Sequence, residues 1–262
     1  MLIDTHAHLC AEELFDRSSS IVKELKNEGL EAVICPSYDI LSNKRTLELS
    51  NKYHDVFGAL GIHPQNCDCW NEEVREFIEK NIKNSKIVAL GEVGLDYHYG
   101  NTAHMEQRQI LLQQLIIAKN MNMPVIFHVR DAWVDFLDFI KDNRDLVQFG
   151  VVHCFDGNID LARKVLDLGF NISFTGLITY QKPYLWEAVK FVPLERTMLE
   201  TDSPYLVPKK MQDKVKENEP KNVKFVAEKI AELKGMHIDK VIEQTTDTAY
   251  NFFKKMRSAD EQ

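Results

Sequence analysis

The sequence predicts an α/β fold in which eight parallel strands alternate with helices, a (β/α)8 barrel forming a single domain over residues 1–262. Eight short β-like runs are each followed by a polar helical stretch, and this alternation is typical of parallel βαβ units. The length of 262 residues also suits one such barrel, which takes about 250 residues. A second domain is not required.

The predicted strands are short and mostly apolar. They are expected at about Leu2–His6, Glu31–Pro36, Val56–Ile62, Ile87–Glu92, Val125–His128, Gly150–His153, Phe170–Phe174 and Thr197–Asp202. Residues 125–127 and 151–152 are continuously apolar, which is expected for strands that are buried on both faces. The sequence therefore favours a parallel sheet that is covered by helices.

Helical patterns fill the segments between the strands. Apolar residues in 223–233 recur three and four positions apart and make one stripe, which we expect to pack on the barrel. Pro124 and Gly169 are stop signals before strands, because proline cannot continue a helix and glycine tolerates a left-handed cap. A last helix is expected at about Ile238–Met256, and the charged, aperiodic segment Lys209–Asn218 is predicted to be a mobile loop.

Composition and charge limit the class of protein. Hydrophobic residues make up 44% and charged residues 27% of the chain, which is the balance of an ordinary globular protein rather than a disordered one. The formal net charge of -8 has the wrong sign for a protein that coats nucleic acid by charge alone. It is compatible with a site that grips a few phosphates, because two bound divalent cations would reverse the potential there.

The chain ends, apolar runs and cysteines bear on location. The first residues lack a basic region followed by an apolar stretch, and no apolar run approaches the roughly 20 residues of a membrane span. The five cysteines are odd in number and lack a paired CxxC pattern, which favours free thiols in a reducing compartment. We expect a cytoplasmic protein without membrane association, and the sequence is compatible with a monomer.

Ligand-type side chains recur where the predicted strands end. The residues that end or immediately follow the strands are His6, His8, His63, Glu92, His128, His153 and Asp202. Side chains at the carboxyl ends of barrel strands converge on one face, which is where barrel enzymes have their active sites. The pattern therefore predicts one shared site at one end of the barrel.

His6 and His8 are two residues apart, so the alternation of an extended chain aims both imidazoles the same way, toward one ion. Taken alone, the pair is equally compatible with two incidental histidines beside Asp4. The ligand-type residues at the other strand ends favour the metal site. Imidazole and carboxylate suit Zn²⁺ or Mn²⁺, whereas Mg²⁺ usually takes more oxygen ligands.

Two carboxylates complete the set. Glu92 lies between Gly91 and Gly94, whose small size allows backbone and ligands to approach closely, and its two oxygens are able to bridge two ions. Asp202 follows an apolar run and precedes Pro204, which ends the strand. A turn or helix N-cap is the alternative role for Asp202.

The remaining histidines are expected outside this site. His54 and His237 lie in polar segments, and His104 lies at the start of a helical stretch, where surface positions are usual. His98 follows the fourth strand, and we expect it to form hydrogen bonds within a loop.

Six motifs occur in order along the chain, at Asp4–Leu9, Gly61–Pro64, Gly91–Tyr97, Pro124–Ala132, His153–Gly157 and Glu200–Leu206. Together they resemble the motifs of TatD-type deoxyribonucleases, and jointly they are highly specific. The resemblance continues at Gln107, Gln114, Asn218–Pro220, Ile230–Gly235 and Asn251–Phe253, and so covers nearly the whole chain.

The resemblance implies two divalent cations, of Zn²⁺, Mn²⁺ or Mg²⁺. It assigns one cation to His6, His8, Glu92 and Asp202, and the other to Glu92, His128 and His153. Glu92 is then the bridge between them. No separate nucleophile of the Ser-His-Asp or Cys-His type is recognisable in the chain.

The activity that the resemblance implies is hydrolysis of DNA phosphodiester bonds, from a 3′ end, by metal-activated water. Paired ions lower the pKa of a shared water, hold a phosphate oxygen and stabilise the leaving alkoxide. The expected catalytic residues are Glu92, Asp202 and His63, and Asp202 would accept the water's proton. His63 and Arg130 are the expected phosphate contacts, because the planar guanidinium matches phosphate oxygens.

Two positions depart from the family pattern, and two other functions stay open. Gln65 stands where many members have histidine, and Val129 replaces a common serine, so both bear on substrate contacts rather than on the metal ligands. The same constellation would also activate water against an ester or an amide, as in an aminoacyl deacylase. A non-catalytic scaffold is the third possibility, and the complete ligand set speaks against it.

Overall fold

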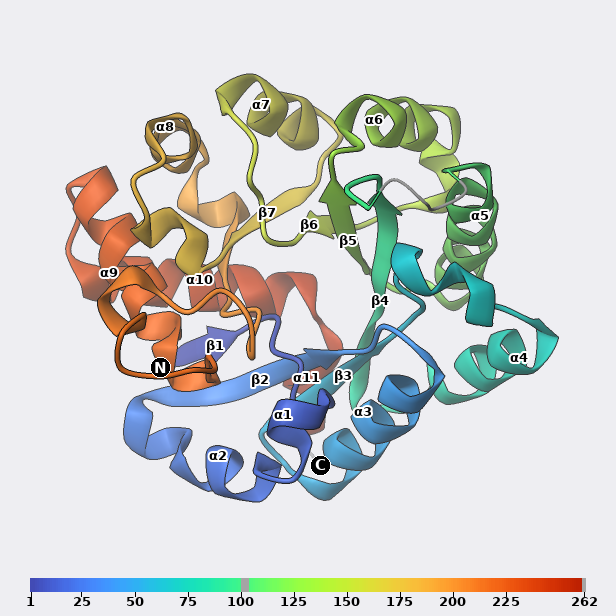
Figure 1. Ribbon diagram of the computed structural model, residues 1–262, viewed down its shortest axis with the longest axis horizontal. Coiled ribbons are helices and arrows are strands. Elements are labelled where there is room, and N and C mark those ends of the chain that lie inside the picture. Colours follow the sequence, from blue (N-terminus) through green and yellow to red (C-terminus); the bar gives the residue numbers. More distant parts are fainter. Residues whose placement is uncertain (100–103, 261–262) are drawn as a thin grey trace.

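The computed structural model describes residues 1–99 and 104–260. Its eight strands form one parallel sheet in the order β1 to β8. They are β1 (Leu2–Asp4), β2 (Leu30–Pro36), β3 (Val56–Leu60), β4 (Ile87–Asp96), β5 (Val125–Arg130), β6 (Gly150–Val152), β7 (Asn171–Phe174) and β8 (Thr197–Leu199). Figure 1 shows the sheet curled at the centre of the molecule, and the predicted barrel is confirmed.

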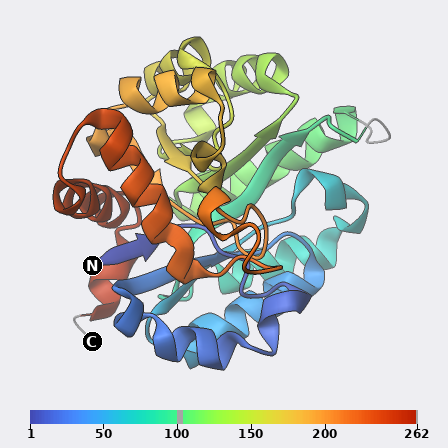
Figure 2. The same cartoon turned by 60° about the vertical axis from the view of Figure 1, so that its left-hand side comes forward.

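Helices form an outer layer around the strands in both views (Figures 1 and 2). The α-helices of the described residues are α1 (Glu12–Phe15), α2 (Ser18–Glu24), α3 (Ile40–Lys52), α4 (Glu72–Asn81), α5 (His104–Met121), α6 (Trp133–Asp142), α7 (Ile159–Asp167), α8 (Pro183–Phe191), α9 (Val223–Lys234), α10 (Ile238–Phe252) and α11 (Lys255–Asp260). Short 3-10 turns connect several of them. Among the described residues, no helix combines the length and apolar character that crossing a membrane requires.

The barrel closes between its first and last strands through the segments that follow them. The backbone N–H of Thr5 donates to the Leu199 carbonyl at 3.0 Å, and the N–H of Asp202 donates to the His6 carbonyl at 2.8 Å. Asp4 reinforces the seam, because its buried carboxylate accepts the backbone N–H of Thr201 at 2.9 Å. Burial raises the pKa of Asp4 well above its usual value. The closure fixes His6 and Asp202 beside each other.

The predicted ends of several strands are wrong, above all the end of β4. This strand was expected to end at Glu92 but continues to Asp96, because it keeps pairing with β5 through Gly94 opposite His128. Strand β5 likewise runs two residues past His128, to Arg130. Glu92 and His128 therefore lie inside strands rather than at their ends, while β1 and β8 end earlier than expected.

The core has an inner and an outer part. Alternate residues of β2 and β3, such as Ile34 and Phe57, belong to a cluster inside the barrel, whereas their neighbours pack against the helices. The inner cluster also includes Phe253 and Met256, which are fully buried. The expected single last helix is wrong here, since the chain leaves α10 at Phe253, with φ -91° and ψ 64°, before α11 begins.

Local signals that the sequence predicted are present. Gly169 has φ +77° after α7, and α5 ends at Met121, three residues before Pro124. The segment Lys209–Asn218 lies between β8 and α9 and contains a short 3-10 turn at its start, and its predicted mobility stays a prediction. The five cysteines are free thiols, as expected.

Gly94 allows β4 and β5 to lie close enough for the site to form. A Cβ atom at this position would lie 1.9 Å from the His128 carbonyl oxygen. We expect Gly94→Ala to lower the free energy of unfolding by about 3 kcal/mol or more, because the strands must separate to admit a methyl group. Urea unfolding measures the change.

Gly235→Ala is the matched control. Gly235 also has positive φ, at +63°, but a Cβ there would meet nothing within 4 Å, so only backbone strain of about 1–2 kcal/mol is expected. Equal losses of stability in the two variants would contradict the role given to Gly94.

Candidate metal centre

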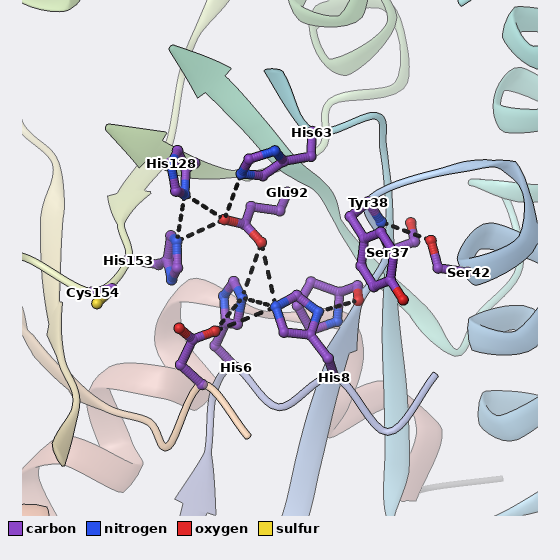
Figure 3. A network of polar contacts seen from close by, with 12 residues as sticks. His6, His8, Ser37, Tyr38, Ser42, His63, Glu92, His128, His153 and Cys154 are labelled. Carbon is purple, nitrogen blue, oxygen red and sulfur yellow. Dashed lines mark hydrogen bonds and ion pairs between the residues drawn. The ribbon is translucent and has the colours of Figure 1, made fainter. Parts of the chain in front are cut away.

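The predicted ligand-type side chains meet at one end of the barrel. Figure 3 shows imidazoles around the Glu92 carboxylate, and all of them belong to the set that the sequence singled out: His6, His8, His63, His128 and His153. Glu92 lies in β4, and its side chain is only 4% exposed. The structure therefore brings histidines from four strands or strand ends to a single carboxylate.

One oxygen of Glu92 faces a first cluster of ligand atoms. Glu92 Oε2 lies 3.3 Å from His6 Nε2 and 3.5 Å from His8 Nε2. Asp202 Oδ1 lies 3.6 Å from His6 Nε2 and 3.3 Å from His8 Nε2, and the two ring nitrogens are 3.2 Å apart. Four ligand atoms thus converge on one point.

The other oxygen of Glu92 faces a second cluster. Glu92 Oε1 lies 2.7 Å from His128 Nδ1 and 2.7 Å from His153 Nε2, and these two nitrogens are 3.2 Å apart. His63 Nε2 lies farther away, at 3.7 Å. Glu92 therefore presents a different oxygen to each cluster (Figure 3).

The first cluster has the dimensions of a metal site. Four ligands at about 2.0–2.1 Å from a tetrahedral Zn²⁺ lie about 3.3 Å from one another. The five distances between ligand atoms of His6, His8, Glu92 and Asp202 run from 3.2 to 3.6 Å. The residues present therefore fit a divalent cation, and the imidazole-carboxylate donor set suits Zn²⁺ or Mn²⁺.

Partners behind the rings orient two of the histidines. His8 Nδ1 lies 3.1 Å from the Pro36 carbonyl, and His128 Nε2 lies 3.0 Å from Asp96 Oδ2. A carbonyl and a carboxylate only accept, so each of these nitrogens carries the proton. When each ring is neutral, its opposite nitrogen presents a lone pair to the cluster, as a metal ligand must.

His63 is oriented in the opposite sense. Its Nδ1 accepts the backbone N–H of Gln65 at 3.1 Å, so the proton of the neutral ring is on Nε2, which points toward Glu92. Burial, followed by the nearby His128, lowers the pKa of His63 to about 3 and keeps the ring neutral. His63 is therefore presented as a hydrogen-bond donor rather than as a ligand.

The charges of the cluster depend on one another. Burial opposes ionisation of Glu92, but His153 and His6 outweigh it and hold the pKa of Glu92 well below its usual value. Burial also opposes the charged form of His8, yet Asp202 and Glu92 raise its pKa to about 9. The carboxylates of Glu92 and Asp202 are thus anionic. Protons on the rings, or cations bound between the rings and the carboxylates, are what balances this negative charge.

Arg130 lies on the same face of β5 as His128, because it is two residues further along the strand. Its guanidinium lies 5.4 Å from the centre of the Tyr99 ring. Asp131, the next residue along the chain, contacts His98 Nδ1 at 2.7 Å. Arg130 is half-buried and ends β5, two residues after His128 of the second cluster.

The other histidines lie outside the cluster, as predicted. His54, His104 and His237 are exposed, and the ring of His104 stacks on Tyr97. His98 makes the expected loop contact, through Asp131.

Sequence reasoning gave no role to two buried carboxylates beside the site. Asp96 contacts His128, and Glu200 Oε1 lies 3.5 Å from His153 Nδ1 while accepting the backbone N–H of Cys154 at 2.6 Å. The alternation of an extended chain was the available signal, since Asp96 is four residues after Glu92 and Glu200 is two before Asp202.

The chain is similar to proteins of a known family. Residues 3–254 match the model of a family described as TatD related DNase. The chain belongs to the TatD family. It is 35% identical to an uncharacterised metal-dependent hydrolase, YabD of Bacillus subtilis strain 168, over 97% of this chain and 99% of the relative.

Two further TatD relatives bear on function and fold. A protein named 3′-5′ ssDNA/RNA exonuclease TatD, from Pantoea ananatis, is 25% identical over 96% of this chain and 99% of its own. The solved structure of YjjV, a TatD homologue from Escherichia coli K12, superposes with a TM-score of 0.91 at 27% identity, covering 97% of this chain and 98% of that one. The chain is a metal-dependent hydrolase of the TatD family.

Proposed function

We propose that this TatD family member is a two-cation deoxyribonuclease that removes nucleotides from a 3′ end of DNA. The observation that carries the proposal is the Glu92 carboxylate, whose two oxygens face two separate clusters of ring nitrogens. The name of the Pantoea ananatis relative supports the nuclease activity, whereas YabD is described only as a metal-dependent hydrolase.

In this proposal each cluster holds one cation. The ligands of the first would be His6, His8, Glu92 and Asp202, and those of the second would be Glu92, His128 and His153. When bound, such a cation pair activates water, binds a phosphate oxygen and neutralises the leaving alkoxide. Zn²⁺ and Mn²⁺ suit the histidine-rich donor set better than Mg²⁺ does.

The remaining residues would handle the proton and the phosphate. The Asp202 side chain is 13% exposed, more than that of His6 or Glu92, so water reaches this carboxylate and it is placed to accept a proton. His63 offers its Nε2 proton as a hydrogen bond to a phosphate oxygen. Arg130 offers two parallel N–H donors from the edge of the second cluster.

An ester or amide hydrolase, such as an aminoacyl deacylase, is the competing function for the same residues. The water activation that bound cations would supply suits any of these carbonyl or phosphoryl centres, so the metal centre does not select among them. The net charge of -8 disfavours binding along an extended DNA duplex and favours contact with a few phosphates at the end of a strand.

Removal and return of the cations tests the proposed activity. Protein stripped by a chelator should lose hydrolysis of end-labelled DNA, and Zn²⁺, Mn²⁺ or Mg²⁺ should restore it, because no other attacking group is evident. Linear DNA should be shortened from its 3′ ends while closed circular DNA stays intact. Full activity in excess chelator would contradict metal dependence, and faster cleavage of ester or amide substrates would favour the competing function.

Replacement of Glu92 tests the bridge. Glu92→Gln keeps the size of the side chain and removes the charge that offsets two cations, so at least one cation should bind far more weakly and turnover should collapse. Metal stoichiometry, melting temperature and turnover are measured together. We expect the fold to survive.

Glu200→Gln is the matched control, since Glu200 is also a buried carboxylate but contacts His153 from behind. Loss of such a supporting contact costs about 10- to 100-fold in metal affinity or activity. Two tightly held cations and near-normal turnover in Glu92→Gln would refute the bridge.

Arg130 should act on the substrate rather than on the cations, because a guanidinium does not ligate a metal. We expect Arg130→Ala to keep normal metal content and to lose turnover on DNA. Arg163→Ala is the control, since Arg163 is an exposed arginine on α7 that pairs with Asp160. Unchanged kinetics in Arg130→Ala would remove Arg130 from the phosphate site.

A further inference from the structure

We propose that Gln65 and Asp96 form a positioning pair that holds the proton of the neutral His128 ring on Nε2. The other nitrogen, Nδ1, then faces the second cluster with its lone pair. The inference rests on the proposed two-cation site and concerns residues that lie behind it. Gln65 follows β3, in η2 (Pro64–Cys69), and Asp96 ends β4, so the pair joins two neighbouring strands of the barrel.

One carboxylate oxygen joins the two side chains. Asp96 Oδ2 accepts the Gln65 amide at 2.8 Å and lies 3.0 Å from His128 Nε2. The second oxygen, Oδ1, accepts the backbone N–H of His98 at 3.0 Å. Asp96 is 1% exposed, so these contacts are shielded from competing water.

The backbone of Asp96 is also held in place. Gln107, on α5, accepts the Asp96 N–H at 2.9 Å and donates to the Asp96 carbonyl at 2.8 Å. The carboxylate therefore sits at a defined point relative to β5, where His128 lies opposite Gly94. A fixed acceptor is what the proton on His128 Nε2 requires.

Two carboxylates compete for a proton on His128. A proton on Nε2 is bonded to Asp96, whereas a proton on Nδ1 would be bonded to Glu92 Oε1 at 2.7 Å and would block the lone pair that a cation needs. Asp96 favours the first arrangement. Gln65 supports it, because its amide donates to Oδ2 and holds that oxygen as an acceptor facing His128.

Gln65 acts on two histidines through different atoms. Its backbone N–H donates to His63 Nδ1, and its side chain donates to Asp96 behind His128. A change of the Gln65 side chain leaves the backbone contact to His63 in place. The two effects are therefore separable, and a side-chain variant should act on the second cluster alone.

Cation binding tests the pair without using activity. Titration of metal-free protein with Zn²⁺ should give two sites in the wild type. In Gln65→Glu, which has the same shape but sets a carboxylate against Asp96, and in Asp96→Ala, the second site should lose about 10- to 100-fold in affinity. The first site, at His6, His8, Glu92 and Asp202, should be unchanged.

Gln113→Ala is the matched control. Gln113 accepts a single hydrogen bond from Trp70, at the other end of η2, so its loss perturbs the same segment without touching Asp96. Gln65→Ala serves if the two stronger variants fold poorly, because Gln65 is only half-buried. A purely structural role would lower the melting temperature and leave the ratio of the two affinities unchanged.

The position of the proton gives a second readout. Proton-nitrogen couplings in ¹⁵N-histidine-labelled, metal-free protein, recorded where the imidazole is neutral, should place the His128 proton on Nε2 in the wild type and move it in Asp96→Ala. A proton on Nδ1 in the wild type, or variants whose second site equals that of Gln113→Ala, would overturn the positioning pair. Fewer than two sites in the wild type would instead overturn the proposed two-cation centre.

Discussion

The buried Glu92 carboxylate is the constraint on which the rest of the site depends. An isolated anion at this depth would cost several kcal/mol, and the protein offsets that cost by surrounding it with imidazoles from other strands. His6 and His8 contact one carboxylate oxygen, and His128 and His153 contact the other. The two-sided arrangement is what makes the site suited to a pair of cations.

The two ends of the barrel differ in the side chains that fill them. At one end, apolar side chains fill the interior, and Phe253 and Met256 complete the packing after α10. At the other end, polar side chains lie at the ends of the strands, and positive φ occurs at Asp202 itself and directly after two other site residues, at Asp131 and Cys154. Such backbone conformations persist only where surrounding structure holds them, and they gather at functional sites.

The orientation of each ring decides what it contributes. His8 and His128 have acceptors behind them and present lone pairs to the clusters, whereas His63 has a donor behind it and presents a proton. Rings of the same chemical type thereby take different roles within a few ångströms. Asp96 and Glu200 belong to the site for this reason, although neither faces its centre.

The sequence by itself determined the parallel eight-stranded barrel and the candidate site residues at its strand ends, because strand alternation and residue chemistry are local properties. His6, His8, His153 and Asp202 were recognisable beside short apolar runs for that reason. Only the tertiary structure decided that Glu92 lies within β4 with an oxygen toward each cluster. It also decided which partners lie behind each histidine, since contacts such as Asp96 with His128 depend on the register of neighbouring strands, which no local pattern encodes.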